Sequence, residues 1–230
     1  PTKNKATIDF KSELNDDQYK AVTAPFGPAL VLAGAGSGKT RTLTYRVAYL
    51  LSEGVNPEDI LLLTFTNKAS KQMLERVEEL TGMGAHRFLG GTFHHVGGQV
   101  LRLFGDSIGL PRNYTILDDS DSDSLLSEVI RDLDPDFFKS KENPKAKPIK
   151  GIISYSRNVM VPVEEVAKGR YPSNGELLAN IGAFMREYQE AKISRGLADY
   201  DDLLVLWLQV LETNQDAAQY YQDRFSHILV

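Results

Sequence analysis

The chain has 230 residues, of which 42% are hydrophobic and 25% are charged, and its formal net charge is −5. These values are ordinary for a globular protein and argue against a surface that is basic throughout, although local basic patches remain open. The sequence contains no cysteine, which excludes a disulfide framework and thiolate metal sites and suits a reducing compartment. It shows neither a long uncharged apolar run nor the apolar core of a signal peptide, so we expect no membrane partner and a cytoplasmic location.

The N-terminal part predicts a loose arm followed by a helix and a strand. Residues Pro1–Lys11 have no periodic pattern, and a helix opens at Leu14-Asn15-Asp16-Asp17-Gln18. Asn15 can cap this helix, and Gln18 three residues later completes a capping box. After a proline-rich turn, the apolar run Ala29–Leu32 predicts a first buried strand.

A glycine-rich stretch with the sequence AGAGSGKT follows that run and leads directly into a helix-patterned segment. Glycines allow the backbone to turn tightly and to point N–H groups at an anion, so the context predicts a phosphate-binding loop. A lysine can then reach the terminal phosphates, and a threonine hydroxyl can bind Mg²⁺. The alternative is a glycine-rich turn with a chance Lys-Thr pair, because the strict motif has glycine where this chain has alanine. The residues of the predicted loop are Ala33, Gly34, Ala35, Gly36, Ser37, Gly38, Lys39 and Thr40.

Strand and helix patterns then alternate, which is typical of an α/β fold with a parallel sheet. The helix after the loop ends near Glu53-Gly54, and the apolar run from Ile60 to Thr66 predicts a strand buried on both faces. Asn67 can cap a helix over Lys68–Leu80. A third strand is expected over Phe88–Phe93, followed by a helix to about Phe104.

From about Gly105 the pattern changes, and no strand is expected between Asp106 and Arg195. The predicted helices here begin at the acidic stretch Asp118–Asp123 and continue over Val163–Lys168 and Gly175–Arg195. A basic stretch lies between them, and it is either a solvated surface or a duplex-contacting one; its members are Lys139, Lys141, Lys145, Lys147, Lys150 and Arg157. Helices are expected again over Leu203–Leu211 and Asp216–Arg224, before a final strand over Phe225–Val230.

Several of these stretches, in this order, resemble the N-terminal part of superfamily 1 DNA helicases of the UvrD/PcrA/Rep type. The matching segments are LNDDQYKAV (Leu14–Val22), AGAGSGKT, LLLTFTNKAS (Leu61–Ser70), GTFHHVGGQVLR (Gly91–Arg102) and DYDDLL (Asp199–Leu204). Alanine at the first loop position is usual in that family, so Ala33 supports the resemblance. The resemblance implies a RecA-like P-loop NTPase domain over residues 1–106 and 197–230, interrupted by an all-helical subdomain over residues 107–196.

The resemblance also implies roles for individual residues. Gln18 would read the edge of adenine, and Arg41 would lie near the base or sugar of ATP. The expected DNA-contacting residues follow two strand ends and open one later helix; they are Thr64, Phe65, Thr66, Asn67, Thr92, Phe93, His94 and Tyr200.

Each of these roles has a structural alternative. Gln18 can serve only the capping box, and Arg41 can be a surface residue. Phe65 can be a buried aromatic, Thr92 a helix cap, and His94 a partly buried histidine. Carboxylates in the first turn favour the positive end of a helix dipole, so we reject a metal site at Asp199, Asp201 and Asp202.

The implied function is that of an ATP-dependent 3′-to-5′ DNA helicase with ATP and Mg²⁺ as cofactors and single-stranded DNA and its junction with duplex as partners. In that family an Asp-Glu pair that holds Mg²⁺ follows the strand ending at Val230, and a second motor domain completes the site. We therefore expect an N-terminal fragment that is monomeric, binds nucleotide weakly and has negligible turnover alone. The alternatives are a helicase–nuclease subunit of the RecB/AddA type in recombinational repair, a kinase or GTPase-like nucleotide-binding module, and a scaffold that binds nothing.

Overall fold

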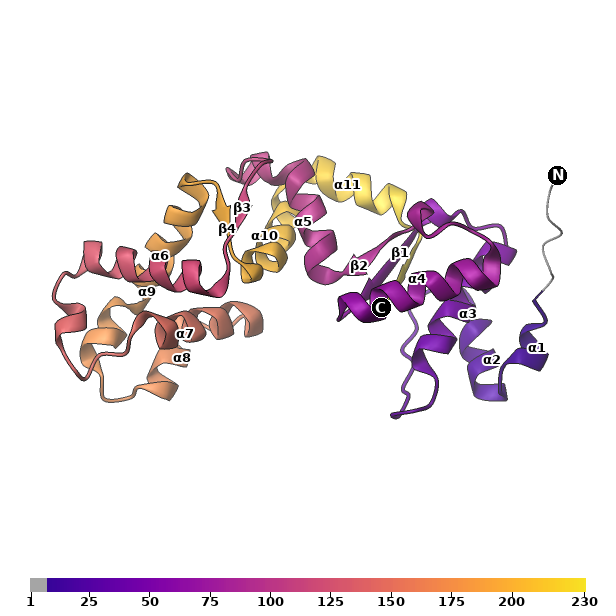
Figure 1. Cartoon of the computed structure of the whole chain (residues 1–230), viewed down its shortest axis with the longest axis horizontal. Helices are drawn as coiled ribbons and strands as arrows, with labels where there is room; N and C mark the ends of the chain where they lie inside the picture. The colour runs from indigo at the N-terminus through magenta and orange to yellow at the C-terminus, as the bar shows by residue number, and fades with distance from the viewer. Residues whose placement is uncertain (1–7) are drawn as a thin grey trace. The chain divides into compact units, whose positions relative to one another are not determined.

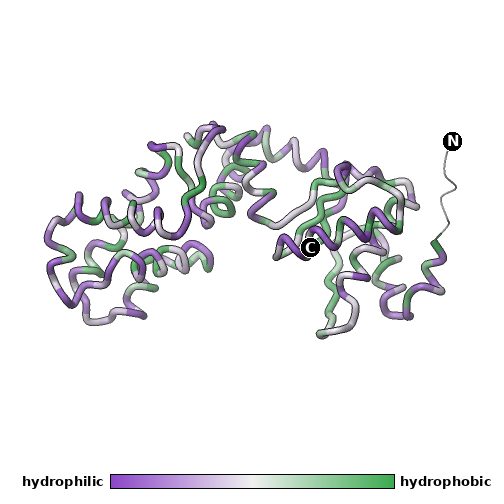
Figure 2. Tube along the Cα trace, viewed as in Figure 1, coloured by the Kyte–Doolittle hydropathy of each residue, from purple (hydrophilic) through white to green (hydrophobic). Residues whose placement is uncertain are grey.

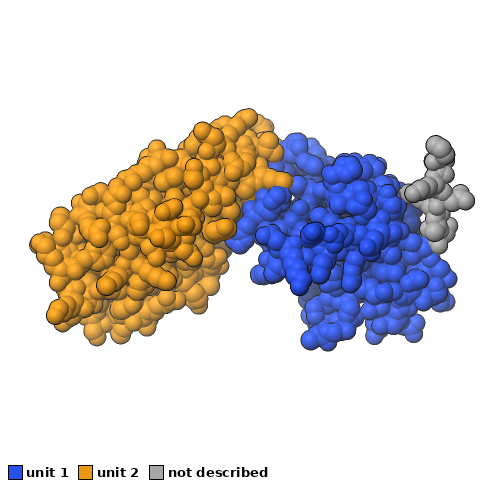
Figure 3. Space-filling model, viewed as in Figure 1, with its two compact units in different colours: residues 1–96, 219–230 blue, residues 97–218 orange. Residues whose placement is uncertain are grey.

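A computed structural model describes residues 8–230 and divides the chain into two compact units (Figures 1 and 3). Unit 1 comprises residues up to Val96 together with Gln219–Val230, and unit 2 comprises Gly97–Ala218. The predicted motor domain, residues 1–106 and 197–230, and the predicted insertion, residues 107–196, have limits that differ from those of these units. The division into motor domain and insertion stays a prediction. The predicted loose arm over Pro1–Lys11 lies largely outside the described residues, although α1 (Phe10–Glu13) begins within it and is capped by Asp9.

A three-stranded parallel sheet with the order β2-β1-β5 forms the centre of unit 1. The central strand β1 (Ile60–Thr64) pairs with β2 (Leu89–Thr92) on one side and with β5 (His227–Leu229) on the other. The first four residues of β1 are all buried, as expected for a strand covered on both faces. The three strands expected from Ile60, Phe88 and Phe225 onward are therefore confirmed.

Helices of unit 1 pack against this sheet and against one another. The predicted capping box opens α2 (Asp16–Val22), and α3 (Lys39–Ser52) follows the glycine-rich loop. α4 (Asn67–Thr81) packs on α3 and on β2, and α5 (Phe93–Phe104) follows β2 directly. Two single 3₁₀ turns, η1 (Pro57–Asp59) and η2 (Ala85–Arg87), precede β1 and β2. The apolar core between α3, α4 and the sheet includes Leu50, Leu62 and Val77.

The predicted strand over Ala29–Leu32 is wrong. These residues adopt no regular structure, and the side chains of Leu30 and Leu32 are 86% and 87% exposed. A strand is stabilised by ladder hydrogen bonds and by burial of a face, and within residues 8–230 this run has neither. Apolar composition by itself does not create a strand when no neighbouring strand pairs with it.

Unit 2 is mostly helical, and its helices were largely predicted. Figure 2 shows hydrophilic and hydrophobic residues alternating along the helical tube, which is typical of helices with one buried face. The helices are α6 (Asp119–Leu133), α7 (Ala146–Val159), α8 (Val163–Arg170), α9 (Gly175–Ser194), α10 (Tyr200–Thr213) and α11 (Gln215–Arg224), the last of which continues into unit 1. Short 3₁₀ turns, η3 (Gly105–Ile108) and η4 (Phe137–Lys139), connect them.

The expectation of an all-helical insertion is corrected by a short parallel ladder. Strand β3 (Thr115–Ile116) pairs with β4 (Leu197–Ala198), and the Leu117 N–H extends the ladder by donating to the Ala198 carbonyl at 2.8 Å. Two residues are too few to give an alternating pattern in the sequence, so periodicity alone could not reveal them.

Helix α7 was not predicted because Pro135 and Pro144 precede it and Pro148 lies within it. One of them, Pro148, lies in the first turn of α7, where the missing N–H would have no partner within the helix in any case. Its Ile149, Ile152 and Ile153 are buried in the core of unit 2. Among the described residues, no helix has the length and apolarity needed to cross a membrane.

Candidate nucleotide and nucleic-acid sites

The glycine-rich loop has the backbone that a phosphate-binding loop requires. Gly36 and Gly38 have φ values of 76° and 84°, in the left-handed region that side chains other than glycine seldom adopt. Gly38 directly precedes α3 and makes no side-chain cap. The first N–H groups of α3 therefore face the loop, where an anion is favoured.

Lys39 and Thr40 open α3 beside this loop. The Lys39 ammonium donates to the carbonyl oxygens of Gly34 at 2.8 Å and of Ala33 at 3.3 Å. The Ser37 hydroxyl also donates to the Gly34 carbonyl, at 2.8 Å. Both Lys39 and Thr40 are exposed, so an ammonium and a hydroxyl are available at a helix N-terminus whose N–H groups attract phosphate.

Gln18 performs its capping role and also contacts the loop. Its Oε1 accepts from the Asn15 N–H at 3.3 Å, while the Asn15 side chain accepts from the Gln18 N–H at 2.9 Å. Its Nε2 donates to the Ser37 carbonyl at 3.0 Å. A Cβ added at Gly38 would lie only 2.7 Å from that nitrogen, so glycine at position 38 lets Gln18 approach the loop closely.

Arg41 connects the loop helix to α1. Its guanidinium donates to the carbonyl and carboxylate oxygens of Glu13 at 2.8 and 3.1 Å. It also lies over the ring of Tyr45; burial, followed by the hydrogen bond to Glu13, raises the pKa of that phenol. Arg41 is thus held at one end of α3, on the same helix as Lys39.

The carboxyl ends of β1 and β2 bring together the two segments that were predicted to contact DNA. Thr64 and Thr92 are register partners, and the Thr64 hydroxyl donates to the Thr66 carbonyl at 3.2 Å. Just beyond these ends, the rings of Phe65 and Phe93 meet edge to face at 6.2 Å. Phe65 is 90% exposed, so the alternative of a buried aromatic is wrong.

Two predicted helix caps are resolved at this edge. The Thr66 hydroxyl accepts from the Ala69 N–H at 3.1 Å, so Thr66 caps α4 and the prediction that Asn67 does so is wrong. Asn67 is instead the first residue of the helix and is exposed. Thr92 is buried and its hydroxyl accepts from the His95 N–H at 3.2 Å, which confirms the capping alternative for Thr92.

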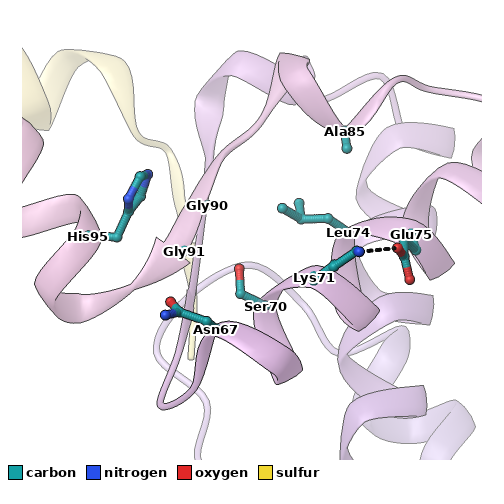
Figure 4. A pocket seen from close by; sticks show the side chains of 9 residues that line it. All are labelled: Asn67, Ser70, Lys71, Leu74, Glu75, Ala85, Gly90, Gly91 and His95. Carbon is teal, nitrogen blue, oxygen red and sulfur yellow. Dashed lines mark ion pairs between the residues drawn. The ribbon is translucent and has the colours of Figure 1, made fainter.

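An open hollow of about 340 Å³ lies between α4 and β2 in unit 1, and sequence reasoning missed it (Figure 4). Its lining residues come from α4, β2, η2 and the first turn of α5; they are Asn67, Ser70, Lys71, Leu74, Glu75, Ala85, Gly90, Gly91 and His95. The one signal in the sequence was the spacing of Asn67, Ser70, Lys71 and Leu74, which places them on one face of a helix.

The aspartates of the DYDDLL segment belong to an ion cluster in unit 2. Asp199 and Asp202 form a capping box on α10, which confirms the capping account. The Lys192 ammonium lies 2.5 Å from Asp199 and 2.6 Å from Asp202, and the Arg157 guanidinium lies 2.7 Å from Asp202. Burial opposes the ionisation of Asp199, but the charges of Lys192 and Arg157 outweigh it and lower the pKa of that carboxyl. Tyr200, which directly follows Asp199, is 58% exposed.

The basic stretch is not one continuous surface. Lys150 lies between Asp119 and Asp123 at 3.0 and 2.8 Å, and Arg157 is buried in the ion cluster. The remaining members are the lysines at 139, 141, 145 and 147, of which Lys139 is paired with Asp136. A duplex-contacting role could therefore involve only part of the predicted stretch.

Comparison with known proteins identifies the family. The sequence matches the UvrD/REP helicase N-terminal domain over residues 14–230. It is 38% identical over 222 residues to the ATP-dependent DNA helicase PcrA of Bacillus subtilis (strain 168). This aligned region covers 95% of this chain and 29% of that protein. It is 36% identical over 218 residues to the PcrA of Staphylococcus epidermidis (strain ATCC 12228 / FDA PCI 1200), covering 94% of this chain and 29% of that protein. The PcrA of Staphylococcus aureus (strain NCTC 8325 / PS 47) is 36% identical over 220 residues, with coverages of 95% and 29%. The chain thus spans less than a third of the length of these curated relatives.

Proposed function

The chain belongs to the UvrD/REP helicase N-terminal domain family, and from that membership we propose that it is the ATP-binding motor part of a 3′-to-5′ DNA helicase. In the whole protein, ATP binding and hydrolysis would drive translocation along a single strand and unwinding at its junction with duplex. The relatives reported above carry the PcrA helicase name, which does not favour the helicase–nuclease alternative.

One observation carries the proposal: unit 1 contains both a glycine-rich loop at the N-terminus of α3 and an aromatic pair, Phe65 and Phe93, just beyond the carboxyl ends of β1 and β2, of which Phe65 is 90% exposed. Ligands of open parallel sheets collect at that edge. The loop supplies N–H groups and the Lys39 ammonium, which stabilise charge on the transferred phosphoryl group. Phe65 supplies an exposed ring on which a base can stack whatever its identity.

The remaining nucleotide contacts follow from the same geometry. The Thr40 hydroxyl, exposed in the first turn of α3, would hold Mg²⁺ together with phosphate oxygens. Gln18, already against the loop through Ser37, would read the adenine edge, and Arg41 would lie near the base or sugar. Thr64, Thr66, Asn67, Phe93 and His94 would line the DNA path in unit 1, and Tyr200 would contact DNA from unit 2.

Thermal unfolding with Mg-ATP tests the proposed nucleotide site. At a nucleotide concentration a hundredfold above the dissociation constant, binding should add about 2.7 kcal/mol of stability, which raises the Tm by several degrees. Lys39→Ala should remove most of this shift because the cation beside the phosphates is lost. Lys20→Ala is the matched control, since Lys20 is exposed on α2 and, within residues 8–230, forms an ion pair only with Asp17. Equal shifts in the wild type and Lys39→Ala would contradict the assignment.

A further inference from the structure

We propose that Asn158, in the last turn of α7, is a positioning residue that fixes the start of α10 and thereby holds Tyr200 in place for the single strand. This inference rests on the proposed function, in which Tyr200 contacts DNA, and deepens it. It gives a residue of the predicted insertion a part in strand binding, through α10 and without a DNA contact of its own.

The three aspartates that precede and follow Tyr200 are all held by hydrogen bonds. The Asp199 carboxylate accepts from the Asp202 N–H at 3.0 Å, and the Asp202 carboxylate accepts from the Asp199 N–H at 2.9 Å. Asp201 is held separately, because the Asn158 amide donates to its carboxylate at 2.8 Å. A side chain on a backbone that is already fixed costs less to order when a ligand binds, so these bonds pre-organise Tyr200.

The end of α7 that carries Asn158 is itself anchored. The Val161 N–H donates to the Ser156 carbonyl at 3.1 Å, and the Ser156 hydroxyl donates to the Val161 carbonyl at 2.7 Å. Arg157, the residue before Asn158, is buried in the ion cluster with the aspartates of α10. Two consecutive residues of α7 therefore hold the first turn of α10, one from inside the core and one from the surface.

Backbone contacts fix the chain on both sides of this turn. The carbonyl of Ala198, the last residue of β4, accepts from the Leu117 N–H at 2.8 Å. Further along α10, a Cβ at Gly97 would clash with the Leu203 carbonyl oxygen, so glycine at position 97 lets α5 approach α10 closely. The bond from Asn158, which is exposed, can therefore be removed without opening the core of unit 2.

The alternative is a bond that only stabilises the fold. Asn158 is exposed and Asp201 is partly exposed, and a hydrogen bond open to water contributes little to the net free energy of unfolding. A base that stacks on Tyr200 needs the ring in a defined place, because stacking requires contact between two faces. Tyr200 is 58% exposed, so its ring has surface to offer to a base. Strand binding is therefore the measurement that separates the two roles.

A double-mutant cycle with the whole chain tests the proposal, with binding of a fluorescent dodecathymidylate read by anisotropy. Tyr200→Ala should weaken binding about tenfold, as loss of one stacking ring does. Asn158→Ala should weaken binding about threefold when Tyr200 is present. In the Tyr200→Ala background it should weaken binding by less than about 1.3-fold, because the ring that it positions is absent. Equal factors in the two backgrounds would overturn the positioning role.

Exchange of donor and acceptor provides a rescue. Asn158→Asp places two carboxylates side by side and should weaken binding more than Asn158→Ala does. The double variant Asn158→Asp/Asp201→Asn has the net charge of the wild type and restores the hydrogen bond with its direction reversed. Its affinity should return to within about twofold of the wild type, because general attraction to phosphates depends on charge that is unchanged. A double variant as weak as Asn158→Asp would contradict the proposal.

Asn180→Ala is the matched control. The Asn180 amide donates to the Glu176 carbonyl at 3.1 Å, as the Asn158 amide donates to the Ser154 carbonyl at 2.9 Å. Within residues 8–230, Asn180 forms no side-chain hydrogen bond to another helix, so its loss should leave strand binding unchanged. Urea unfolding followed by tryptophan fluorescence should show that each variant is folded at the concentrations used.

Other outcomes separate this inference from the proposed function. If Phe65→Ala weakens binding while Tyr200→Ala does not, the positioning role fails but the proposed function stands. If Asn158→Ala lowers the free energy of unfolding and leaves strand binding unchanged, the bond to Asp201 is structural only and the inference is overturned. If the wild type does not bind the strand at all, both fail.

Discussion

The two units place charged and aromatic residues in opposite environments. In unit 1 two residues proposed to contact ligands, Lys39 beside the glycine-rich loop and Phe65 at the strand end, are open to solvent. In unit 2 the side chain of Lys192 is 1% exposed and is held by two aspartates. Two lysines that look alike in the sequence thus lie in different environments, and burial is the property that separates them.

The same contrast applies to the acidic segment DYDDLL, which resembles a helicase motif. Asp199 and Asp202 are buried and paired with Lys192 and Arg157, so their charges stabilise the junction of α7, α9 and α10. Between them, Tyr200 is 58% exposed and Asp201 is partly exposed. Within this motif the two aspartates therefore have a structural role, and the proposed DNA contact concerns Tyr200.

The largest effect is expected when the buried lysine is neutralised. Lys192→Met leaves two buried carboxylates short of a countercharge, which should cost about 3–5 kcal/mol in the free energy of unfolding. Urea unfolding followed by Trp207 fluorescence measures this directly, because Trp207 is the only tryptophan and lies on α10 of unit 2.

Lys168→Met is the matched control for this variant. Lys168 is exposed in the last turn of α8, so its loss should change the free energy of unfolding by less than about 0.5 kcal/mol. Similar losses in the two variants would show that burial does not separate the roles of these lysines.

The free energy of unfolding should depend on pH through the same ion cluster, and this effect should be smaller than that of Lys192→Met. The pKa of Asp199 is lowered in the folded state, so its ionisation stabilises the fold above the unfolded pKa of about 3.9. This contribution is lost as the pH falls through the folded pKa. The stability difference between the wild type and Asp199→Asn should be constant from pH 7 to about 5 and shrink below about pH 4. Trp207 fluorescence in urea provides the measurement, and a difference that grows on acidification would contradict the ion pairing.

Exposed aromatics in unit 1 offer the corresponding test of ligand roles. Phe65→Ala should weaken binding of single-stranded DNA by about 1–3 kcal/mol, as removal of one stacking ring does, and should leave stability nearly unchanged because the ring is 90% exposed. Phe26→Ala is the control, since Phe26 is also exposed but lies in the loop before the apolar run. Anisotropy titration should detect a loss in the first variant only. A loss in unfolding free energy without a loss of binding would make Phe65 a structural residue.

The sequence predicted local features well and non-local ones poorly. Caps depend on neighbouring residues, so the capping box at Asn15 and the capping of α10 by its acidic residues were predicted. The run Ala29–Leu32 was misassigned because strand formation depends on a partner that local sequence does not reveal. The ion cluster could not be predicted either, because its members come from three different helices. Arg157 lies on α7 and Lys192 on α9, whereas the two aspartates lie at the start of α10. Of the candidate sites, the loop was predicted from its motif, whereas the hollow depends on the approach of α4 to β2.

The smallest expected effect is that of replacing Gln18, which has two candidate roles: a capping contact in α2 and recognition of adenine. As a cap alone, Gln18→Ala should cost about 0.5–1 kcal/mol of unfolding free energy and change Mg-ATP and Mg-GTP shifts equally. If Gln18 also reads adenine, the variant should lose the preference for ATP over GTP in the thermal shift. Asn15→Ala is the matched control, because it removes the other half of the capping box without touching Ser37. Loss of the preference in Gln18→Ala but not in Asn15→Ala would assign the adenine contact to the Gln18 amide, whose Nε2 already reaches the loop at 3.0 Å. Equal behaviour of the two variants would leave Gln18 as a cap only.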